Sequence, residues 1–190
     1  IADSSANPSY VAADLLSQAE HDKRARAILV TDSEALADAV ESEIERQLKL
    51  LPREAIARPS IENNGRIIIT KDTDAMFELM NSVAPEHLEI AMEKAYDYLE
   101  KVENAGSVFL GHFTSEPIGD YYAGANHILP TTATSRFSSA LGVHDFVKRI
   151  QYTQYDKAAV NKAKHDITTL AYAEGLQAHA KAIEVRNDNN

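Results

Sequence analysis

The sequence predicts an α/β fold with a parallel β-sheet, followed by a helical C-terminal tail. Short apolar runs alternate with segments whose apolar residues recur every three or four positions, which is the pattern of strand–helix units in a parallel sheet. Glycine, proline, asparagine and aspartate separate these segments, as expected for turns and helix caps. After residue 142 the patterns are helical only. These observations favour an α/β domain with helices on both faces of its sheet and a tail of different construction.

The first helix is predicted to begin at Asn7-Pro8, because asparagine is a favoured N-cap and proline a favoured residue of the first turn. Its apolar stripe consists of Val11, Ala12, Leu15, Leu16 and Ala19. Gln18 and His21 lie together beside that stripe. The pair is either a half-exposed helix edge or two ligands of a divalent ion, since an amide oxygen and an imidazole can both coordinate a metal.

Apolar runs bounded by turn residues predict strands at residues 27–31, 66–70 and 107–110. Residues 86–91 alternate between polar and apolar, so this segment is either another strand or the first turns of a helix. Ile1-Ala2-Asp3 resembles the tail of a strand, and we expect the N-terminus to be cut from something longer. The sheet is therefore expected to be an incomplete, Rossmann-like parallel sheet.

Helices are expected between the strands. One is capped by Asp32-Ser33 and ends at Pro52, another is capped by Asp72 or Thr73, and a third spans residues 94–102. Asn63-Asn64-Gly65 is expected to form a turn before the second strand.

The C-terminal tail should contain a short helix over residues 144–150 and a last helix that ends or bends at Gly175. We expect residues 1–142 to form the α/β domain, as part of a longer catalytic domain, and residues 143–190 to form the helical tail. Because the tail follows the α/β unit, it is a candidate for packing on another subunit.

The composition excludes several classes of function. The net charge is -10, which argues against nucleic acid as a partner because phosphate binding needs a basic surface. There are no cysteines, so disulfides and thiolate zinc sites are excluded. No apolar run approaches the roughly 18 residues of a membrane span, no signal peptide is visible, and neither Gly-x-Gly-x-x-Gly nor a Walker loop occurs. We expect a cytoplasmic protein without the usual phosphate-binding loops.

A long stretch after the strand at 107–110 is the first candidate for the site. It lacks periodicity but contains aromatic and apolar residues, which indicates an ordered loop rather than disorder. We expect it to present Asp120, Asn126 and His127. Because ligands of such sheets bind beyond the carboxyl ends of the strands, we expect the site at that edge.

Glu86 and His87 are a second candidate, because a carboxylate and an imidazole are suited to proton transfer near neutral pH. Other acid–imidazole neighbours, such as His144-Asp145, show that the dipeptide alone is weak evidence. His179, in the tail, is by its pattern alone a solvated histidine.

Taken together, the motifs resemble one family, L-histidinol dehydrogenase, which catalyses the last step of histidine biosynthesis. The resemblance follows the family's order over the whole chain and matches what looks like the C-terminal half of the full enzyme. The motifs are Ser-Gln-Ala-Glu-His at 17–21, Ala-Pro-Glu-His-Leu-Glu at 84–89, Ala-Gly-Ser-Val-Phe-Leu-Gly at 105–111, Gly-Asp-Tyr at 119–121, Asn-His-Ile-Leu-Pro-Thr at 126–131 and Ala-Glu-Gly-Leu-Gln-Ala-His at 173–179.

The resemblance implies a homodimer with exchanged tails, zinc as cofactor and oxidation of the histidinol alcohol to the carboxylate of histidine with two molecules of NAD. It implies four metal ligands that also contact substrate, namely Gln18, His21, Asp120 and, from the other subunit, His179. Glu86 and His87 would be the proton-transfer pair, His87 would also contact substrate, and Glu174 would be a further substrate contact. His127 matches a motif near the site without an assigned role.

Two departures limit the resemblance. Most NAD contacts of the family, and a substrate-contacting serine, would come from the half that precedes Ile1. Residues 121–126 are Tyr-Tyr-Ala-Gly-Ala-Asn where Tyr-Ala-Ser-Gly-Thr-Asn is expected. Two alternatives stay open: a non-catalytic relative that binds zinc and substrate or serves dimerisation, and an unrelated α/β small-molecule binder. On its own, the chain is expected not to turn over NAD.

Overall fold

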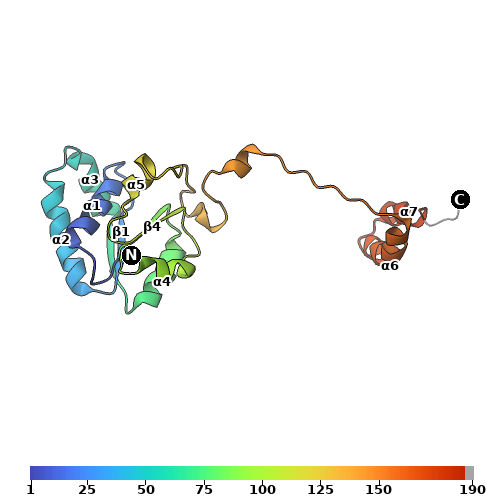
Figure 1. Ribbon diagram of the computed structural model, residues 1–190, viewed down its shortest axis with the longest axis horizontal. Coiled ribbons are helices and arrows are strands. Elements are labelled where there is room, and N and C mark those ends of the chain that lie inside the picture. Colours follow the sequence, from blue (N-terminus) through green and yellow to red (C-terminus); the bar gives the residue numbers. More distant parts are fainter. Residues whose placement is uncertain (187–190) are drawn as a thin grey trace. The chain divides into compact units, whose positions relative to one another are not determined.

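The computed structural model describes residues 1–186 (Figure 1). The chain forms two compact units, Ile1–Phe146 and Val147–Asn190. The first unit contains α1 (Pro8–Ala19), β1 (Ile28–Thr31), α2 (Glu34–Leu48), α3 (Glu54–Asn64), β2 (Arg66–Ile69), α4 (Thr73–Val83), β3 (His87–Ile90), the 3₁₀ helix η1 (Ala95–Lys101), β4 (Ser107–Leu110), α5 (Glu116–Tyr121) and the 3₁₀ helices η2 (Thr134–Arg136) and η3 (Val143–Phe146). The second contains α6 (Lys157–Ala173) and α7 (Gln177–Glu184). Along residues 1–186, no helix has the length and apolar character needed to cross a membrane.

The sheet is built from two parallel pairs, β1 with β2 and β3 with β4. The N-terminal residues join these pairs, because Ala2 bridges Thr31 of β1 on one side and Ala91, next to β3, on the other, both in parallel. The Ala2 N–H donates to the Val30 carbonyl at 3.1 Å, and the Ala91 N–H donates to the Ile1 carbonyl at 2.8 Å. Residues 1–2 therefore run as the end of a strand between β1 and β3, as the sequence predicts.

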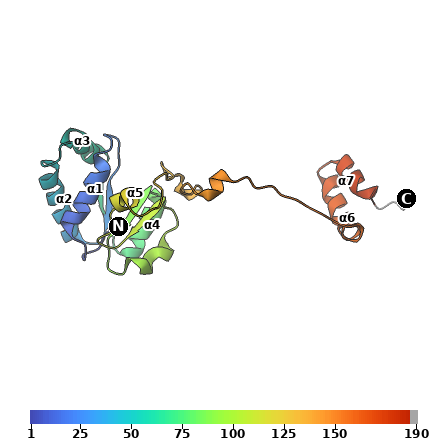
Figure 2. The ribbon, with the colours of Figure 1, turned by 45° about the horizontal axis from the view of Figure 1, so that its top comes forward.

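Alternate residues of the strands pack against helices on opposite faces of the sheet. Leu29 belongs to the apolar core formed with α1 and α2, whereas Val30, Leu88 and Ile90 belong to the core formed with α4. The views agree, with α1 and α2 on one side of β1 and α4 on the other (Figures 1 and 2). The predicted α/β fold with helices on both faces is confirmed, and the segment 86–91 contains the strand β3 rather than the start of a helix.

Helix α3 was not expected, because Pro59 lies inside it and lacks the N–H that a helix interior needs. Contacts with the chain before β1 hold the helix in place. The buried Ser60 hydroxyl donates to the Ala25 carbonyl at 3.0 Å, and the Asn64 amide donates to the Lys23 carbonyl at 3.0 Å. Asn64 therefore ends a helix at the position where the sequence indicated only a turn.

Two other expected helices were wrong in type or length. The helix expected over 94–102 is a 3₁₀ helix over Ala95–Lys101 that follows Lys94 in the left-handed region, with φ of 53°. The helix expected over 144–150 is a single 3₁₀ turn, Val143–Phe146. Short 3₁₀ turns of this kind serve as connectors and do not need an amphipathic stripe.

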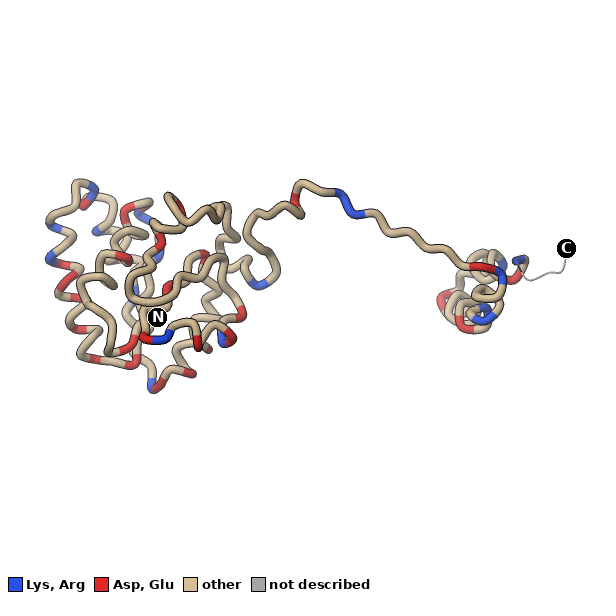
Figure 3. The backbone as a smooth tube through the Cα atoms, in the orientation of Figure 1, with Lys and Arg blue, Asp and Glu red and all other residues tan. Residues whose placement is uncertain are grey.

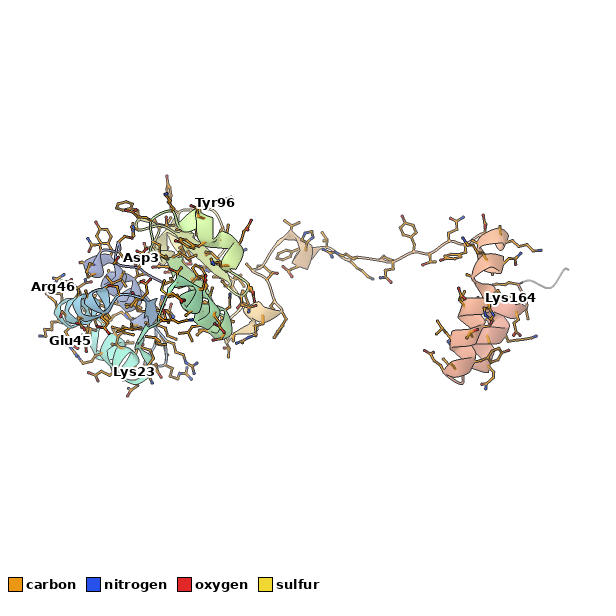
Figure 4. All side chains as sticks on the ribbon, turned by 90° about the horizontal axis from the view of Figure 1, so that it is seen from below. Asp3, Lys23, Glu45, Arg46, Tyr96 and Lys164 are labelled. Atoms are coloured by element: carbon orange, nitrogen blue, oxygen red, sulfur yellow. The ribbon has the colours of Figure 1, made fainter. Side chains whose placement is uncertain are left out.

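The outer surfaces of α2 and α3 are charged. Arg58 of α3 contacts Glu54 at 2.8 Å and Glu45 of α2 at 3.1 Å. Glu45 and Arg46 lie on the outside of α2 (Figure 4), and acidic residues are spread over both units (Figure 3). Exposed ion pairs contribute little to stability, so the apolar core that residues of α2 and α3 such as Val40 and Ala57 share with α1 contributes more.

The second unit is a helical hairpin. Asp156 caps α6 by accepting the Ala159 N–H at 2.8 Å, and Gly175, with φ of 74°, turns the chain after α6. Its buried apolar residues among those described are Ala171 and Ala180. The predicted helical nature of the tail is confirmed, whereas its boundary at residue 143 within a longer enzyme stays a prediction.

Candidate functional site

Three side chains that are far apart in the sequence meet in the first unit. His87, Glu116 and Asp120 each offer a ligand atom, and these atoms all lie within 4.8 Å of one another. His87 is the first residue of β3, while Glu116 and Asp120 lie one turn apart on α5 and so share one face of that helix. Two carboxylates and an imidazole form a donor set that suits a divalent cation.

Gly119 sets the position of α5. A Cβ added at this residue would lie 2.7 Å from Cε1 of Phe109, a buried side chain of β4. The close approach is open only to glycine, so α5 lies directly against the strand. This places the neighbouring Asp120 beside the start of β3.

The cluster is crowded with negative charge. Burial and the nearby Asp120 carboxylate raise the pKa of Glu116, whereas the imidazole of His21 lowers it. Nε2 of His87 lies 3.8 Å from Oε1 of Glu116, and the two side chains are 21% and 14% exposed. A bound cation would relieve the repulsion between the two carboxylates.

A second carboxyl pair supports α5 from the sheet. Oε1 of Glu89, on β3, accepts the backbone N–H of Glu116 at 2.8 Å. Burial, together with the charge of Asp14 and a hydrogen bond that the protonated Glu89 donates to it, raises the pKa of Glu89 to about 8. The pKa of Asp14 is also raised, chiefly by burial. At neutral pH the pair therefore retains a proton, and Glu89 positions Glu116.

A cavity of about 620 Å³ lies beside the cluster, and it is lined by Gln18, Glu86, His87, Glu89 and Glu116 among others. The ring of His87 packs 6.2 Å, centroid to centroid, from that of Phe109. The structure therefore places Glu86 and His87, the predicted proton-transfer pair, at the same cavity as Gln18.

The predicted residues fall into two groups. Gln18, His21, Glu86, His87 and Asp120 lie in the first unit, where His21 acts on the pKa of Glu116. Glu174 follows α6 and His179 lies on α7, both exposed, in the second unit. The shared metal set of Gln18, His21, Asp120 and His179 therefore stays a prediction.

The loop residues have different roles. Nδ1 of the exposed His127 lies 3.7 Å from Oδ1 of Asp120. Asn126 instead holds the loop itself, because its side chain donates to the Leu141 carbonyl and accepts the Ile128 N–H at 2.9 Å. Of the three residues that the loop was expected to present at the site, Asn126 therefore stabilises the loop instead.

The prediction that the site lies beyond the carboxyl ends of the strands was wrong. His87 begins β3, so the cluster lies at the amino end of that strand rather than beyond the carboxyl ends. The reason is that the chain turns at Gly111, with φ of 89°, and α5 returns along the face of the sheet. The bond from Glu116 to Glu89 and the contact of Gly119 with Phe109 fix this return.

Sequence reasoning missed Glu116, Glu89 and Asp14. The spacing of Glu116 and Asp120, one helical turn apart, was a usable signal, but Pro117 and Gly119 between them concealed the helix. Glu89 and Asp14 lie on elements that are distant in the sequence, and only the fold pairs them.

Comparisons with known proteins agree on one family. The family model described as histidinol dehydrogenase matches residues 1–187. A histidinol dehydrogenase of Streptococcus mutans is 84% identical over 190 residues, which cover 100% of this chain and 44% of that protein. One from Listeria monocytogenes is 55% identical over 186 residues, again covering 44% of that protein. The crystal structure of histidinol dehydrogenase from Elizabethkingia anophelis superposes with a TM-score of 0.88 at 40% identity, over 97% of this chain and 42% of that one. The chain thus spans less than half the length of the relatives it matches.

Proposed function

Because the chain belongs to the histidinol dehydrogenase family, we propose that it is the C-terminal portion of an L-histidinol dehydrogenase. The activity of the whole protein is the zinc-dependent, NAD-linked oxidation of L-histidinol through L-histidinal to L-histidine, in histidine biosynthesis. The observation that carries this proposal is the convergence of His87, Glu116 and Asp120 beside a cavity that Gln18 also lines. The cytoplasmic location expected from the composition stays a prediction.

The residues present fit a divalent cation. Burial and repulsion from the Asp120 carboxylate raise the pKa of Glu116, and a bound cation would relieve that repulsion. We assign zinc to Gln18, His21 and Asp120 of one chain and to His179 of a second copy, with Glu116 beside them. Bound zinc supplies a positive centre that orients the imidazole and amine of the substrate.

His87 and Glu86 move the protons. Bound NAD would supply the oxidant for both oxidations. His87 would accept the hydroxyl proton of the alcohol in the first, and Glu86 would take a proton from the water that adds to the aldehyde in the second. The His87 ring lies beside that of Phe109, and its Nε2 lies 3.8 Å from Oε1 of Glu116, so one ring nitrogen faces the cluster.

The carboxylates around the cavity also suit the substrate. L-Histidinol carries an ammonium group near neutral pH, and Glu116, which lines the cavity, supplies the opposite charge as the substrate enters, before the amine loses its proton and reaches the metal. Glu174 is proposed as a further substrate contact. The NAD contacts are assigned mainly to the part of the relatives that this chain does not match. For this reason the chain alone should not reduce NAD when L-histidinol is added.

The exchanged homodimer rests on the second unit. Leu170, Tyr172 and Leu176 are 66%, 49% and 41% exposed, so the hairpin of α6 and α7 leaves much of its apolar surface uncovered. Two short helices bury too little surface to be stable alone. We propose that the surface of another subunit covers them and that this exchange brings His179 to the metal.

Calorimetric titration of zinc into the purified chain tests the proposal. Wild type should bind zinc, and Asp120→Asn and His179→Ala should each weaken binding by at least tenfold, since each removes one ligand. Glu100→Gln, which removes an exposed carboxylate on η1, is the control and should bind as wild type does. His87→Asn should leave zinc affinity within about threefold, because His87 is assigned to proton transfer. If Asp120→Asn binds zinc as tightly as wild type does, the result would favour the alternative, a non-catalytic relative with an idle site.

A further inference from the structure

Two short segments with strained backbone lie at the wall of the cavity. Ala84, which ends α4, has φ of 52°, and a turn over residues 131–134, the strained turn, contains Thr132 and Ala133 with φ of 54° and 62°. Positive φ is uncommon for residues other than glycine, and for a β-branched threonine it is a genuine outlier. All three residues line the cavity together with the predicted proton-transfer pair. Such strain persists only where the surrounding structure holds it, and it gathers at functional sites.

The left-handed conformation of Ala84 lies on the short link between α4 and β3. Only two residues separate Ala84 from His87, the first residue of β3. The Ala84 N–H donates to the Met80 carbonyl at 2.9 Å and closes the helix. Glycine is the usual residue at such a helix end, and the following Pro85 favours extended backbone at residue 84. The local sequence therefore opposes the conformation that leads the chain from the helix to Glu86.

Two side chains that follow the strained turn support this conformation. The Ser135 hydroxyl donates to the Ala84 carbonyl at 3.1 Å. The Arg136 guanidinium donates to the Ser82 carbonyl and, at 3.2 Å, to the Ala133 carbonyl. Carbonyls at the end of a helix have no partner within the helix, so these bonds satisfy groups that α4 leaves open. Arg136 thereby joins the end of α4 to the strained turn.

The strained turn is itself closed by hydrogen bonds. The N–H and the hydroxyl of Thr134 both donate to the Thr131 carbonyl, at 3.1 Å and 2.7 Å. With both central residues left-handed, it is the mirror image of the common type I turn. Ser135 and Arg136 follow directly, so the hand of the turn sets the point from which these side chains reach α4.

The backbone of Glu86 is held from the side of β4 as well. The Gly106 N–H donates to the Pro85 carbonyl at 3.0 Å. The Ser107 N–H donates to the Glu86 carbonyl at 2.9 Å. A Cβ added at Gly106 would lie 2.6 Å from the Glu86 carbonyl oxygen and 3.2 Å from Cδ of Pro130. With β4 fixing the carbonyls that follow, the direction in which the chain arrives is set at the end of α4.

We propose that Ser135 and Arg136 are positioning residues for Glu86 and His87, an inference that rests on the proposed function, in which this pair transfers the protons. They hold Ala84 in its left-handed conformation and so keep both side chains at the cavity. Neither Ser135 nor Arg136 lines the cavity itself, so they act through the backbone of Ala84. If Ala84 relaxed to extended backbone, the chain would enter β3 in another direction and turn Glu86 away from the cavity.

Nuclear magnetic resonance of the 190-residue chain, without zinc, NAD or L-histidinol, tests the proposal. The NOE between the N–H and Hα protons of Ala84 reports its conformation, because these protons are closest at positive φ. Ser135→Ala should weaken this NOE and shift the amide resonances of Glu86 and His87, and Arg136→Ala should act in the same direction. Ser135→Thr keeps the hydroxyl and should resemble wild type. Ser139→Ala, which removes an exposed hydroxyl, is the control and should change none of these signals.

A rescue separates positioning from general stability. Glycine adopts positive φ without support, so Ala84→Gly combined with Ser135→Ala should give the Glu86 and His87 resonances of Ala84→Gly alone. The proposal is overturned if Ser135→Ala leaves the Ala84 NOE and these resonances unchanged, or if Ala84→Gly does not rescue them. Resonance shifts spread over the whole first unit, with a matching loss of stability in urea, would also overturn it.

Binding of L-histidinol to the zinc-loaded chain is the second readout. Ser135→Ala should weaken it by about fivefold, the equivalent of one hydrogen bond, because His87 is a proposed substrate contact. Zinc affinity should stay within about threefold, since the proposed ligands do not depend on Ala84, and Ala84→Gly should restore L-histidinol binding. Unchanged L-histidinol affinity in Ser135→Ala would overturn the positioning role. If wild type binds no L-histidinol, the proposed function fails, and the NOE and the rescue still decide whether Ser135 positions the pair.

Discussion

Replacing Glu89 by glutamine should stabilise the protein at neutral and alkaline pH. Burial and Asp14 raise the pKa of Glu89 from 4.5 to about 8. A carboxyl group whose pKa is raised on folding opposes folding when it is ionised. The contribution of Glu89 to the free energy of unfolding is therefore close to zero below about pH 4.5. It becomes unfavourable as the pH rises from 4.5 to about 8 and stays constant above that pH.

The size of the effect follows from that window. At about 1.4 kcal/mol per pH unit, the ceiling is roughly 5 kcal/mol, but Asp14 shares the proton and solvent screens part of the charge. We expect Glu89→Gln to raise the free energy of unfolding by about 2 kcal/mol at pH 8 and to change it little at pH 4.5. The amide oxygen of glutamine can still accept the Glu116 N–H, so the position of α5 should be kept.

Urea unfolding followed by circular dichroism at pH 5, 6, 7 and 8 measures this. The stability of wild type should fall more steeply with pH than that of Glu89→Gln, and Glu100→Gln should follow wild type. Glu89→Leu removes the acceptor as well as the charge, so it should weaken zinc binding where Glu89→Gln does not. Parallel pH profiles for wild type and Glu89→Gln would refute the reasoning, because the raised pKa of Glu89 would then have no cost in folding.

Two further predictions concern packing around the site. Gly119→Ala should weaken zinc binding by about tenfold, because the added Cβ meets the Phe109 ring and moves α5 away from β4. Combining Gly119→Ala with Phe109→Leu should restore part of the lost affinity. An unchanged zinc affinity in the Gly119→Ala variant would contradict this prediction. Asn81→Ala should lower the free energy of unfolding by about 2 kcal/mol in thermal melts, because the side chain donates to the Lys101 carbonyl at 2.8 Å and accepts the Glu103 N–H at 2.8 Å. Asn81→Asp keeps the acceptor and should lose less, so equal losses in the two variants would argue against this account.

Much of the fold could be predicted because local patterns and tertiary packing agree. The alternation at residues 86–91 predicted a strand as one of two options, and Leu88 and Ile90 are buried on the face that α4 covers. The apolar runs at β1, β2 and β4 are also strands. Helix α3 could not be predicted, since Pro59 weighs against a helix and only the bonds to the chain before β1 outweigh it.

The candidate site was predicted less completely. The residue types and motifs drew attention to Glu86, His87 and Asp120, and the structure brings His87 and Asp120 together. The predicted edge of the sheet was wrong because the direction of α5 depends on the contact of Gly119 with Phe109, which local sequence patterns do not indicate. Glu116 was missed because a helix of six residues with an internal proline and glycine leaves no periodicity to detect.

The most direct test of the central claim is a titration of L-histidinol into the zinc-loaded chain, compared with L-leucinol. The two ligands share the amino alcohol, and only L-histidinol carries an imidazole. If the cluster of His87, Glu116 and Asp120 belongs to a histidinol site, L-histidinol should bind at least tenfold more tightly, and Asp120→Asn should abolish the difference. Equal affinities for the two ligands in the zinc-loaded chain would contradict the assignment.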